Sequence, residues 1–275
     1  MAALRVNLVT LSDFAVRTAS TAALAPMILF IVWIGEGVFF LLLLTSIVLL
    51  ASEWNRLTGG SGAAFSNMTF VVLAGGSLAL AWFFGYIEAL VVVAAAVGVE
   101  ALLAWRKKRN VPFAAFGPIY IIVPLLALMW LRGQPVVGIG SVVWLFLVVW
   151  STDIFAYLIG GTLHSAKLAP SISPGKTWAG LIGGVTCAGL AGGIAGAYLL
   201  SIDAFVFETW STGIQLGIFI GVTAQIGDLG ESWLKRLRML KDSGRIIPGH
   251  GGLLDRVDGL MTSAPMMAVL VWVVG

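Results

Sequence analysis

Nine long apolar stretches dominate this chain of 275 residues and restrict the folds that are open to it. A helix needs roughly 20 apolar residues to cross the hydrocarbon core of a bilayer. Hydrophobic residues make up 59% of the chain and charged residues 11%, whereas about 25% of residues are charged in a typical soluble protein. We therefore predict an all-α polytopic membrane protein with about nine transmembrane helices. The predicted spans cover residues 18–34, 37–52, 67–84, 86–105, 114–131, 136–152, 179–200, 213–227 and 259–274.

Only Gly35, Glu36 and Gly37 separate the first two predicted spans. Glycine is a poor helix former, because its backbone readily leaves the helical conformation. We interpret these three residues as a tight turn between two spans. One long bent helix is the alternative interpretation.

The positive charges predict which ends of the spans face the cytoplasm. If nine spans alternate in direction, 15 of the 16 Lys and Arg residues fall on one side, and Arg132 alone falls on the other. Loops rich in Lys and Arg favour the cytoplasmic side. We therefore expect the N-terminus in the cytoplasm and the C-terminus outside.

The last polar segment, residues 228–258, concentrates charge in an otherwise apolar chain. Cations and carboxylates alternate in it, a mixture that suits a polyphosphate together with a divalent metal. Asp228 adjoins apolar sequence, where an ionised carboxylate is costly unless it is paired or bound to a metal. Charges at a span end are often merely solvated, so residue type alone leaves both interpretations open. The eleven charged residues are Asp228, Glu231, Lys235, Arg236, Arg238, Lys241, Asp242, Arg245, Asp255, Arg256 and Asp258.

Two earlier polar segments also adjoin predicted spans. Asp153 lies at the end of the sixth span, where a solvated helix end is an equally good interpretation. Lys176 and Thr177 precede the seventh span, where the first amides of a helix can face an anion. Gly175-Lys176-Thr177 is not a P-loop, because Pro170 stands where that motif requires glycine. A lysine at a membrane surface can also simply extend its apolar stem toward water.

Three segments, in the expected order, resemble the phosphatidate cytidylyltransferases, the integral membrane enzymes that make CDP-diacylglycerol from CTP and phosphatidic acid. The segments are Asp-x-x-Ala-Tyr at residues 153–157, Ser-Pro-x-Lys-Thr at residues 173–177, and SWLKRLRMLKDSGRIIPGHGGLLDRVD at residues 232–258. The resemblance is good over residues 105–275, and before them it extends only to hydropathy and to the Glu53-Trp54 pair. It implies a nucleotidyltransferase in the bacterial inner (cytoplasmic) membrane, with its active site facing the cytoplasm.

The spans and the motifs divide the chain into two regions. Residues 1–112 are predicted to form an N-terminal transmembrane region of about four spans. Residues 113–275 are predicted to form a C-terminal transmembrane catalytic region. Its cytoplasmic loops are expected at residues 153–178 and 228–258.

Aspartates at the two ends of the charged segment are the predicted metal ligands. Asp255 and Asp258 are three residues apart, so they share one face if the ninth helix begins there. Oxygen ligands select a hard cation, and Mg²⁺ usually takes one or two carboxylates together with substrate phosphate oxygens. We expect Asp228 and Asp255 to hold Mg²⁺, with Asp258 as a supporting ligand and with room for a second cation. The resemblance also implies Asp228 and Asp255 as the metal carboxylates.

The remaining candidates bind or neutralise phosphate. The catalytic candidates are Asp228, Lys235, Arg236, Lys241, Asp242, His250, Asp255, Arg256 and Asp258. The substrate-binding candidates are Asp153, Ser173, Lys176, Thr177 and Ser232. His250 stays open between a phosphate donor, a turn residue and a base. Ser232 is interpreted as a hydrogen-bond donor, because no triad spacing would make it a nucleophile.

The predicted reaction needs no covalent intermediate. The phosphate oxyanion of phosphatidic acid attacks the α-phosphorus of CTP in line and pyrophosphate leaves, so catalysis reduces to positioning and charge neutralisation. A CTP-using lipid-alcohol kinase is the alternative; a transporter is a weaker one, because charged residues are almost absent from the middles of the spans.

The expected partners follow from that reaction. They are CTP, phosphatidic acid and membrane lipid; no Arg-rich arm or aromatic platform points to nucleic acid. The glycine-rich seventh span can serve close helix packing within one chain or a contact in a homodimer.

Overall fold

A computed structural model describes residues 24–59, 64–163, 165–207, 209–244 and 251–274. Within these ranges the chain is mostly helical, as predicted. A helix over Leu24–Ile34 comes first. The helices that follow are α2 (Glu36–Leu57), α3 (Ala64–Phe83), α4 (Tyr86–Arg106), α5 (Val111–Arg132), α6 (Gly138–Thr162), α7 (Trp178–Ser201), α8 (Trp210–Leu237) and α9 (Leu254–Val274).

Five of the described helices, α2, α4, α5, α6 and α7, are long and apolar enough to cross a membrane. Two shorter apolar helices cover Leu24–Ile34 and Met68–Phe83. Large apolar side chains such as Phe83, Ile87 and Trp105 are exposed on the protein surface, which is unfavourable in water and favourable in lipid. The chain is an integral membrane protein. The count of nine spans and the orientation of the termini stay predictions.

The helix break predicted near Gly35 is present. Helix Leu24–Ile34 ends there and α2 starts at Glu36, with Gly35 in a non-helical conformation (φ 158°, ψ 164°). Arg132, at the end of α5, donates from Nε to the carbonyl oxygen of Val32 (2.8 Å) and forms an ion pair with Glu36 (3.6 Å). Both sides of the break are thus attached to the same end of α5, and one continuous helix is not what the chain forms.

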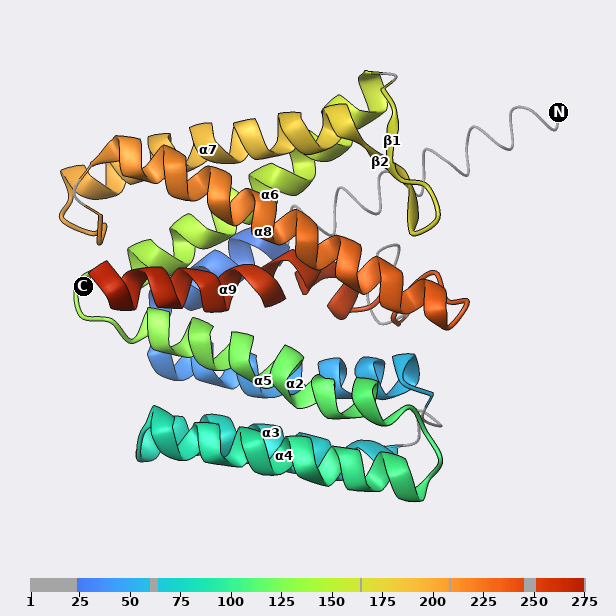
Figure 1. The fold of residues 1–275 in the computed structure, drawn as a ribbon. Coiled ribbons are helices and arrows are strands. Elements are labelled where there is room, and N and C mark those ends of the chain that lie inside the picture. Colours follow the sequence, from blue (N-terminus) through green and yellow to red (C-terminus); the bar gives the residue numbers. More distant parts are fainter. Residues whose placement is uncertain (1–23, 60–63, 164, 208, 245–250, 275) are drawn as a thin grey trace, which may run out of the picture.

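Most helices pack on their neighbours in sequence, and α5 joins the two halves of the chain (Figure 1). α4 packs on α3 and α5, α7 packs on both α6 and α8, α9 packs on α8, and α5 also contacts the sequence-distant helices α2 and α9. The α4–α5 connection, the β-hairpin and the carboxyl end of α8 lie at one end of the bundle, which we call the polar end (Figure 1). The α5–α6 and α7–α8 connections lie at the opposite end (Figure 1). The described parts of the segments that were expected in the cytoplasm therefore share one end of the molecule.

Trp54 attaches the carboxyl end of α2 to α5. Its indole is 2% exposed, and its Nε1 donates to the carbonyl oxygen of Phe113 (3.2 Å). The ring lies 5.2 Å from that of Tyr120, measured between centroids. A Cβ atom at Gly117 would overlap the indole, so the absence of a side chain there lets the two helices approach. This contact holds the end of α2 next to the polar site described below.

Glycines allow close packing between α7 and α8. A Cβ atom at Gly213 would lie 2.6 Å from the carbonyl oxygen of Gly192, and one at Gly217 would lie 2.6 Å from that of Ala188. The buried Trp144 on α6 also donates from Nε1 to Gly192 O (2.8 Å). The glycine-rich seventh span is therefore used for packing within the chain. A homodimer stays a prediction.

A short hairpin departs from the all-α prediction. Strands β1 (Lys167–Ala169) and β2 (Ser173–Thr177) pair antiparallel between α6 and α7. So short a hairpin shows no run of alternating apolar residues, and the Pro174-Gly175 pair indicated only a loop. β2 leads directly into α7, where Thr177 Oγ1 accepts a hydrogen bond from the amide of Gly180 (3.1 Å) and caps the helix.

Candidate active site

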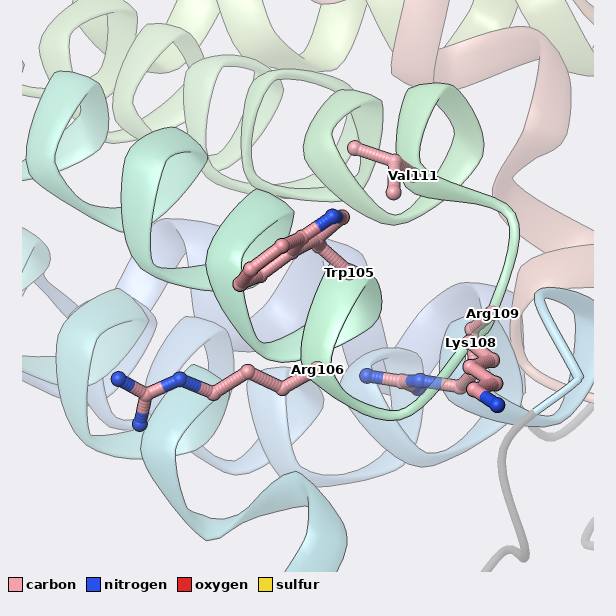
Figure 2. A pocket seen from close by; sticks show the side chains of 5 residues that line it. All are labelled: Trp105, Arg106, Lys108, Arg109 and Val111. Atoms are coloured by element: carbon pink, nitrogen blue, oxygen red, sulfur yellow. The ribbon is translucent and has the colours of Figure 1, made fainter.

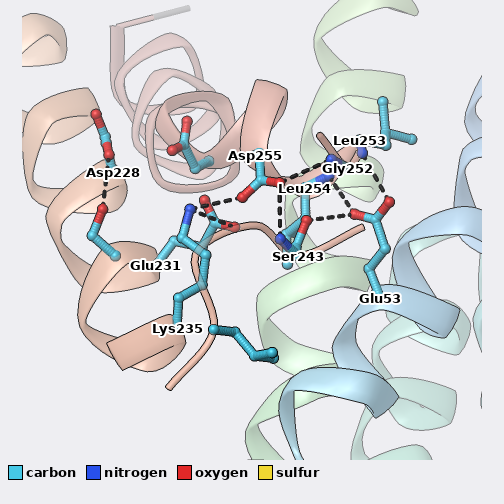
Figure 3. Close-up of polar contacts among 12 residues, drawn as sticks. Glu53, Asp228, Glu231, Lys235, Ser243, Gly252, Leu253, Leu254 and Asp255 are labelled. Atoms are coloured by element: carbon cyan, nitrogen blue, oxygen red, sulfur yellow. Dashed lines mark hydrogen bonds and ion pairs between the residues drawn. The ribbon is translucent and has the colours of Figure 1, made fainter. Parts of the chain in front are cut away.

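The predicted site residues come from several elements that meet at the polar end. Asp153 lies on α6, Lys176 on β2, Asp228 on α8 and Asp255 on α9. Figure 3 shows the polar side chains in a row from Asp228 to Glu53, with Asp255 between them. The arrangement therefore brings residues far apart in sequence into one polar region.

Lys176 joins the hairpin to α8. Its Nζ lies 2.7 Å from Oδ2 of Asp228, and 3.4 Å from the side-chain oxygen of Gln225. The hydroxyl of Ser232 donates to the other carboxylate oxygen of Asp228 (3.4 Å). Asp228 is therefore a paired carboxylate, as expected for a charge beside apolar sequence. Two predicted substrate-binding residues, Lys176 and Ser232, lie against one predicted metal ligand.

Lys235 joins α8 to α9. Its Nζ lies 2.7 Å from Oδ1 of Asp255 and 3.5 Å from a carboxylate oxygen of Glu231. The side chains of Lys235 and Asp255 are 12% and 5% exposed, so water screens this pair weakly. The second oxygen of Asp255 accepts hydrogen bonds from the amides of Ser243 and Gly252, at 2.9 Å each. Asp255 is thus held from both sides.

Asp258 lies one helical turn after Asp255 and within electrostatic reach of Asp228, Glu231 and Asp153. α8 and α9 are close here, because a Cβ atom at Gly227 would lie 2.7 Å from the backbone oxygen of Asp258. Carboxylates from three helices therefore share this region. Carboxylates at short range repel one another, and a bound cation would relieve this repulsion.

Glu231 has a buried carboxylate with an ion-pair partner but no hydrogen bond. The residue is 1% exposed, one of its oxygens lies 3.5 Å from Nζ of Lys235, and neither oxygen has a hydrogen-bond partner among the described residues. The hydroxyl of Tyr120 on α5 is also buried without such a partner there. Buried polar atoms are nearly always hydrogen-bonded, so these atoms are available to a water molecule, a cation or a ligand. In the part of the chain that is described, however, no three His, Cys, Asp or Glu side chains form a metal site by themselves.

Glu53, on α2, accepts three hydrogen bonds from the other half of the chain. The donors are the hydroxyl of Ser243 (2.9 Å) and the amides of Leu253 (2.9 Å) and Leu254 (2.7 Å). Figure 3 shows this carboxylate facing the turn that leads into α9. Glu53 is 3% exposed. It is therefore part of the polar region although it comes from the N-terminal half.

The sequence is similar to those of known enzymes over most of its length. The model of the cytidylyltransferase family matches residues 15–274. A phosphatidate cytidylyltransferase of Brucella abortus is 38% identical over 261 residues, which cover 94% of this chain and 93% of that protein. One of Pseudomonas aeruginosa is 32% identical over 275 residues, which cover 94% and 97%.

The chain belongs to the cytidylyltransferase family. The predicted family and the predicted enzyme class, a nucleotidyltransferase, are confirmed. The match starts at residue 15, whereas the motifs alone carried the resemblance only from about residue 105. The N-terminal helices therefore belong to the family fold as much as the catalytic segment does.

The other predicted site residues take several positions in the fold. Arg236 donates from Nε to the backbone oxygen of Ile172 (3.0 Å), so it holds the tip of the hairpin against α8. Lys241, Asp242 and Arg256 are exposed. Ser173 begins β2 and is half-buried, and Asp153 is exposed. His250 lies outside the described residues.

Sequence reasoning assigned no role to Glu53, Tyr120 or Glu231. Glu231 was counted among the charged residues but not among the site residues. The only sign of Glu53 was its place in the Glu53-Trp54 pair. Neither Glu53 nor Tyr120 lies near a charged motif in sequence, so only the packing of α2 and α5 brings them to the site.

An open pocket of about 600 Å³ lies elsewhere at the polar end (Figure 2). Its lining residues are Trp105, Arg106, Lys108, Arg109 and Val111. None of them is a predicted site residue. The described residues that line this hollow include three cations but no carboxylate, whereas the candidate active site combines both kinds of charge.

Proposed function

We propose that this protein transfers the cytidylyl group of CTP to phosphatidic acid, giving CDP-diacylglycerol and pyrophosphate. The observation that carries the proposal is the pairing of two lysines with two aspartates, Lys176 with Asp228 and Lys235 with Asp255, in the polar region where β2, α8 and α9 meet. Relatives named phosphatidate cytidylyltransferase, at 38% and 32% identity over most of the chain, support it.

The residues act by binding and orienting two anions. An oxygen of the lipid phosphate forms a bond to the α-phosphorus of CTP, while the bond from that phosphorus to the β-phosphate oxygen breaks and pyrophosphate leaves. Lys176, Lys235 and Arg236 neutralise phosphate charge in this arrangement, together with Lys241 and Arg256. The attacking oxygen is already ionised near neutral pH, so no group has to remove a proton from it. Ser232, Ser173 and Thr177 donate hydrogen bonds, and we propose no covalent nucleophile.

We further infer that Mg²⁺ takes part, held by Asp228 and Asp255 with Asp258 in support. The donor chemistry fits, because the anionic groups gathered here are carboxylates and the oxygens of Glu231 accept no hydrogen bond from the described residues. When bound, the ion would stabilise negative charge on phosphate oxygens as a Lewis acid. Substrate phosphate would have to complete its coordination, since the described side chains do not form a metal site alone. A second cation near Asp258 remains part of the proposal.

The membrane setting is proposed on the same grounds. We propose nine spans with a cytoplasmic N-terminus and an outside C-terminus, in the bacterial inner membrane. Residues 1–112 would form the N-terminal region and residues 113–275 the catalytic region, with the polar end in the cytoplasm where CTP is available. We also propose a homodimer, and we assign no surface to the contact between its subunits.

An assay of label transfer tests the function. Purified protein in detergent is given CTP labelled at either the α- or the γ-phosphate, together with phosphatidic acid or a lipid alcohol. Cytidylyl transfer moves the α-label, and not the γ-label, into lipid and requires phosphatidic acid. A lipid-alcohol kinase would move the γ-label instead. Absence of label from lipid in all reactions would contradict both enzymes and leave the transporter. Each reaction is repeated with Mg²⁺ chelated.

A further inference from the structure

Glu53 contacts the charged segment, residues 228–258, at two places. One is Ser243, whose hydroxyl donates to Glu53 Oε2 (2.9 Å). The other is the start of α9, where the amides of Leu253 and Leu254 donate to Oε1 and Oε2 (2.9 and 2.7 Å). These partners lie 190 to 201 residues away in sequence. One buried side chain from α2 therefore ties together the two ends of the stretch from residue 243 to residue 254.

The contact with Glu53 supplies hydrogen-bond acceptors to the start of α9. The first amides of a helix have no partner inside the helix, and a nearby negative charge also interacts favourably with the helix dipole. α9 begins at Leu254, and the carboxylate of Glu53 supplies acceptors for that amide and the preceding one. Hydrogen bonds to a charged acceptor are stronger than neutral ones. Glu53 thus acts as a cap that comes from another helix.

The surrounding backbone is shaped around this carboxylate. A Cβ atom at Gly244 would lie 2.5 Å from Oε1 of Glu53, and one at Gly252 would lie 2.5 Å from Oε2. Both glycines therefore allow the backbone to approach the carboxylate from two sides. Trp54, the next residue, fixes the end of α2 on α5. The position of Glu53 is consequently set by the N-terminal half of the fold.

Ser243 links this cap to the candidate active site. Its hydroxyl contacts Glu53 while its amide donates to Oδ2 of Asp255, which also accepts from Gly252 (2.9 Å each). The opposite oxygen of Asp255 contacts Lys235 (2.7 Å). Figure 3 shows the continuous row from Glu53 through Ser243 and Asp255 to Lys235. A shift of Glu53 would therefore be passed to Asp255 through Ser243, which contacts both carboxylates.

We propose that Glu53 is a positioning residue, which holds Asp255 and the start of α9 in the geometry needed for nucleotidyl transfer. The expected effect on catalysis rests on the proposed function. The expected effect on the start of α9 rests only on the hydrogen bonds. Glu53 contacts the segment that carries Asp255 rather than either substrate, so its loss should lower kcat more than it changes KM.

The test compares Glu53→Gln with Glu100→Gln. The two glutamates are alike, because Glu100 on α4 is also buried, at 6% exposed, but pairs with Arg109 (3.9 Å) away from the catalytic segment. A glutamine at position 53 keeps the shape but its amide nitrogen cannot accept a hydrogen bond. We expect Glu53→Gln to lower kcat by about tenfold or more and to leave KM for CTP within about threefold. Glu100→Gln should leave both within about twofold.

Hydrogen–deuterium exchange gives a second readout that does not depend on turnover. The amides of Gly252, Leu253 and Leu254 should exchange about tenfold faster in Glu53→Gln than in the wild type, and should be unchanged in Glu100→Gln. Unchanged exchange there in Glu53→Gln, or an equal increase in Glu100→Gln, would overturn the inference. Wild-type protein that transfers no cytidylyl group would instead refute the proposed function, and the exchange result would still decide the role of Glu53.

Ser243→Ala keeps the test decisive if Glu53→Gln does not fold. The alanine removes one hydrogen bond to Glu53 and keeps the hydrogen bond from the backbone amide of residue 243 to Asp255. We expect about threefold faster exchange at the same amides and about threefold lower kcat than in the wild type; wild-type values for both would overturn the inference. Where Glu53→Gln folds, the double variant should be no worse than Glu53→Gln alone, because both changes act through one contact. Multiplied effects on kcat would show two independent sites and overturn the inference.

Discussion

Lys235 on α8 and Asp255 on α9 lie 2.7 Å apart, measured from Nζ to Oδ1, and both side chains are almost fully buried. The pair joins the ends of two helices that enter the charged segment from opposite directions. Removing one partner of a buried ion pair leaves the other without compensation, which commonly costs about 3–5 kcal/mol. Substitutions here can therefore lower both activity and stability, and tests of the site must measure the two separately.

Asp255→Asn and Asp228→Asn test the proposed metal site. Each keeps the size of the side chain but removes the charge that faces Lys235 or Lys176. We expect each to lower kcat/KM by roughly a hundredfold or more, about 2.7 kcal/mol, and raised Mg²⁺ should rescue them poorly because a ligand is lost. Turnover of labelled CTP and the elution profile in detergent are measured together.

Asp203→Asn is the matched control for these aspartate variants. Asp203 is exposed and follows α7 at the opposite end of the bundle. Its replacement should leave turnover unchanged. Near-normal turnover by Asp228→Asn, or wild-type activity that survives thorough chelation, would contradict a metal-centred mechanism even with the family assignment intact.

Lys176→Ala and Lys241→Ala test the proposed phosphate contacts. If each lysine faces a phosphate, its loss should reduce kcat/KM by about tenfold or more, about 1.4 kcal/mol. Lys107→Ala serves as the control, since Lys107 is an exposed lysine after α4 outside the site. Steady-state kinetics that match the wild type in both test variants would show that neither lysine contacts a substrate phosphate.

Labelling from the two sides of the membrane tests the orientation. Cysteines introduced at Lys107 and Asp203, in a Cys187→Ala background, replace exposed residues at opposite ends of the bundle. We expect an impermeant thiol reagent to reach position 107 only from the cytoplasm and position 203 only from outside, because Lys and Arg collect on the cytoplasmic side. Labelling of both positions from one side would contradict the proposed topology.

Gly213→Ala tests the close packing of α7 on α8. The added Cβ would lie 2.6 Å from the carbonyl oxygen of Gly192, so the helices must separate. We expect a loss of about 1–3 kcal/mol, seen as a lower Tm in detergent. Gly98→Ala is the control, because nothing lies within 4 Å of its Cβ position and alanine favours a helix; its Tm should be unchanged or higher. Equal Tm values for the two variants would refute the packing role.

The charged segment shows which residues of the site could be predicted from the sequence. Lys176, Asp228, Lys235 and Asp255 were all selected from residue type and motif order, and they do lie in one polar region. The lysine partners of the two aspartates were not foreseen. The metal between the aspartates stays a prediction.

The sequence by itself determined the membrane class, the family and the helix break at Gly35. Each of these depends on local information: the length of apolar runs, the order of motif residues, and the weak helix propensity of glycine. Tertiary structure alone decided that Glu53 contacts Ser243, which is 190 residues away, that Glu231 and Tyr120 are buried at the site, and that glycines of α7 face α8. Such contacts depend on which helix faces pack together, and apolar runs that are hydrophobic on every side do not encode that choice in any local pattern.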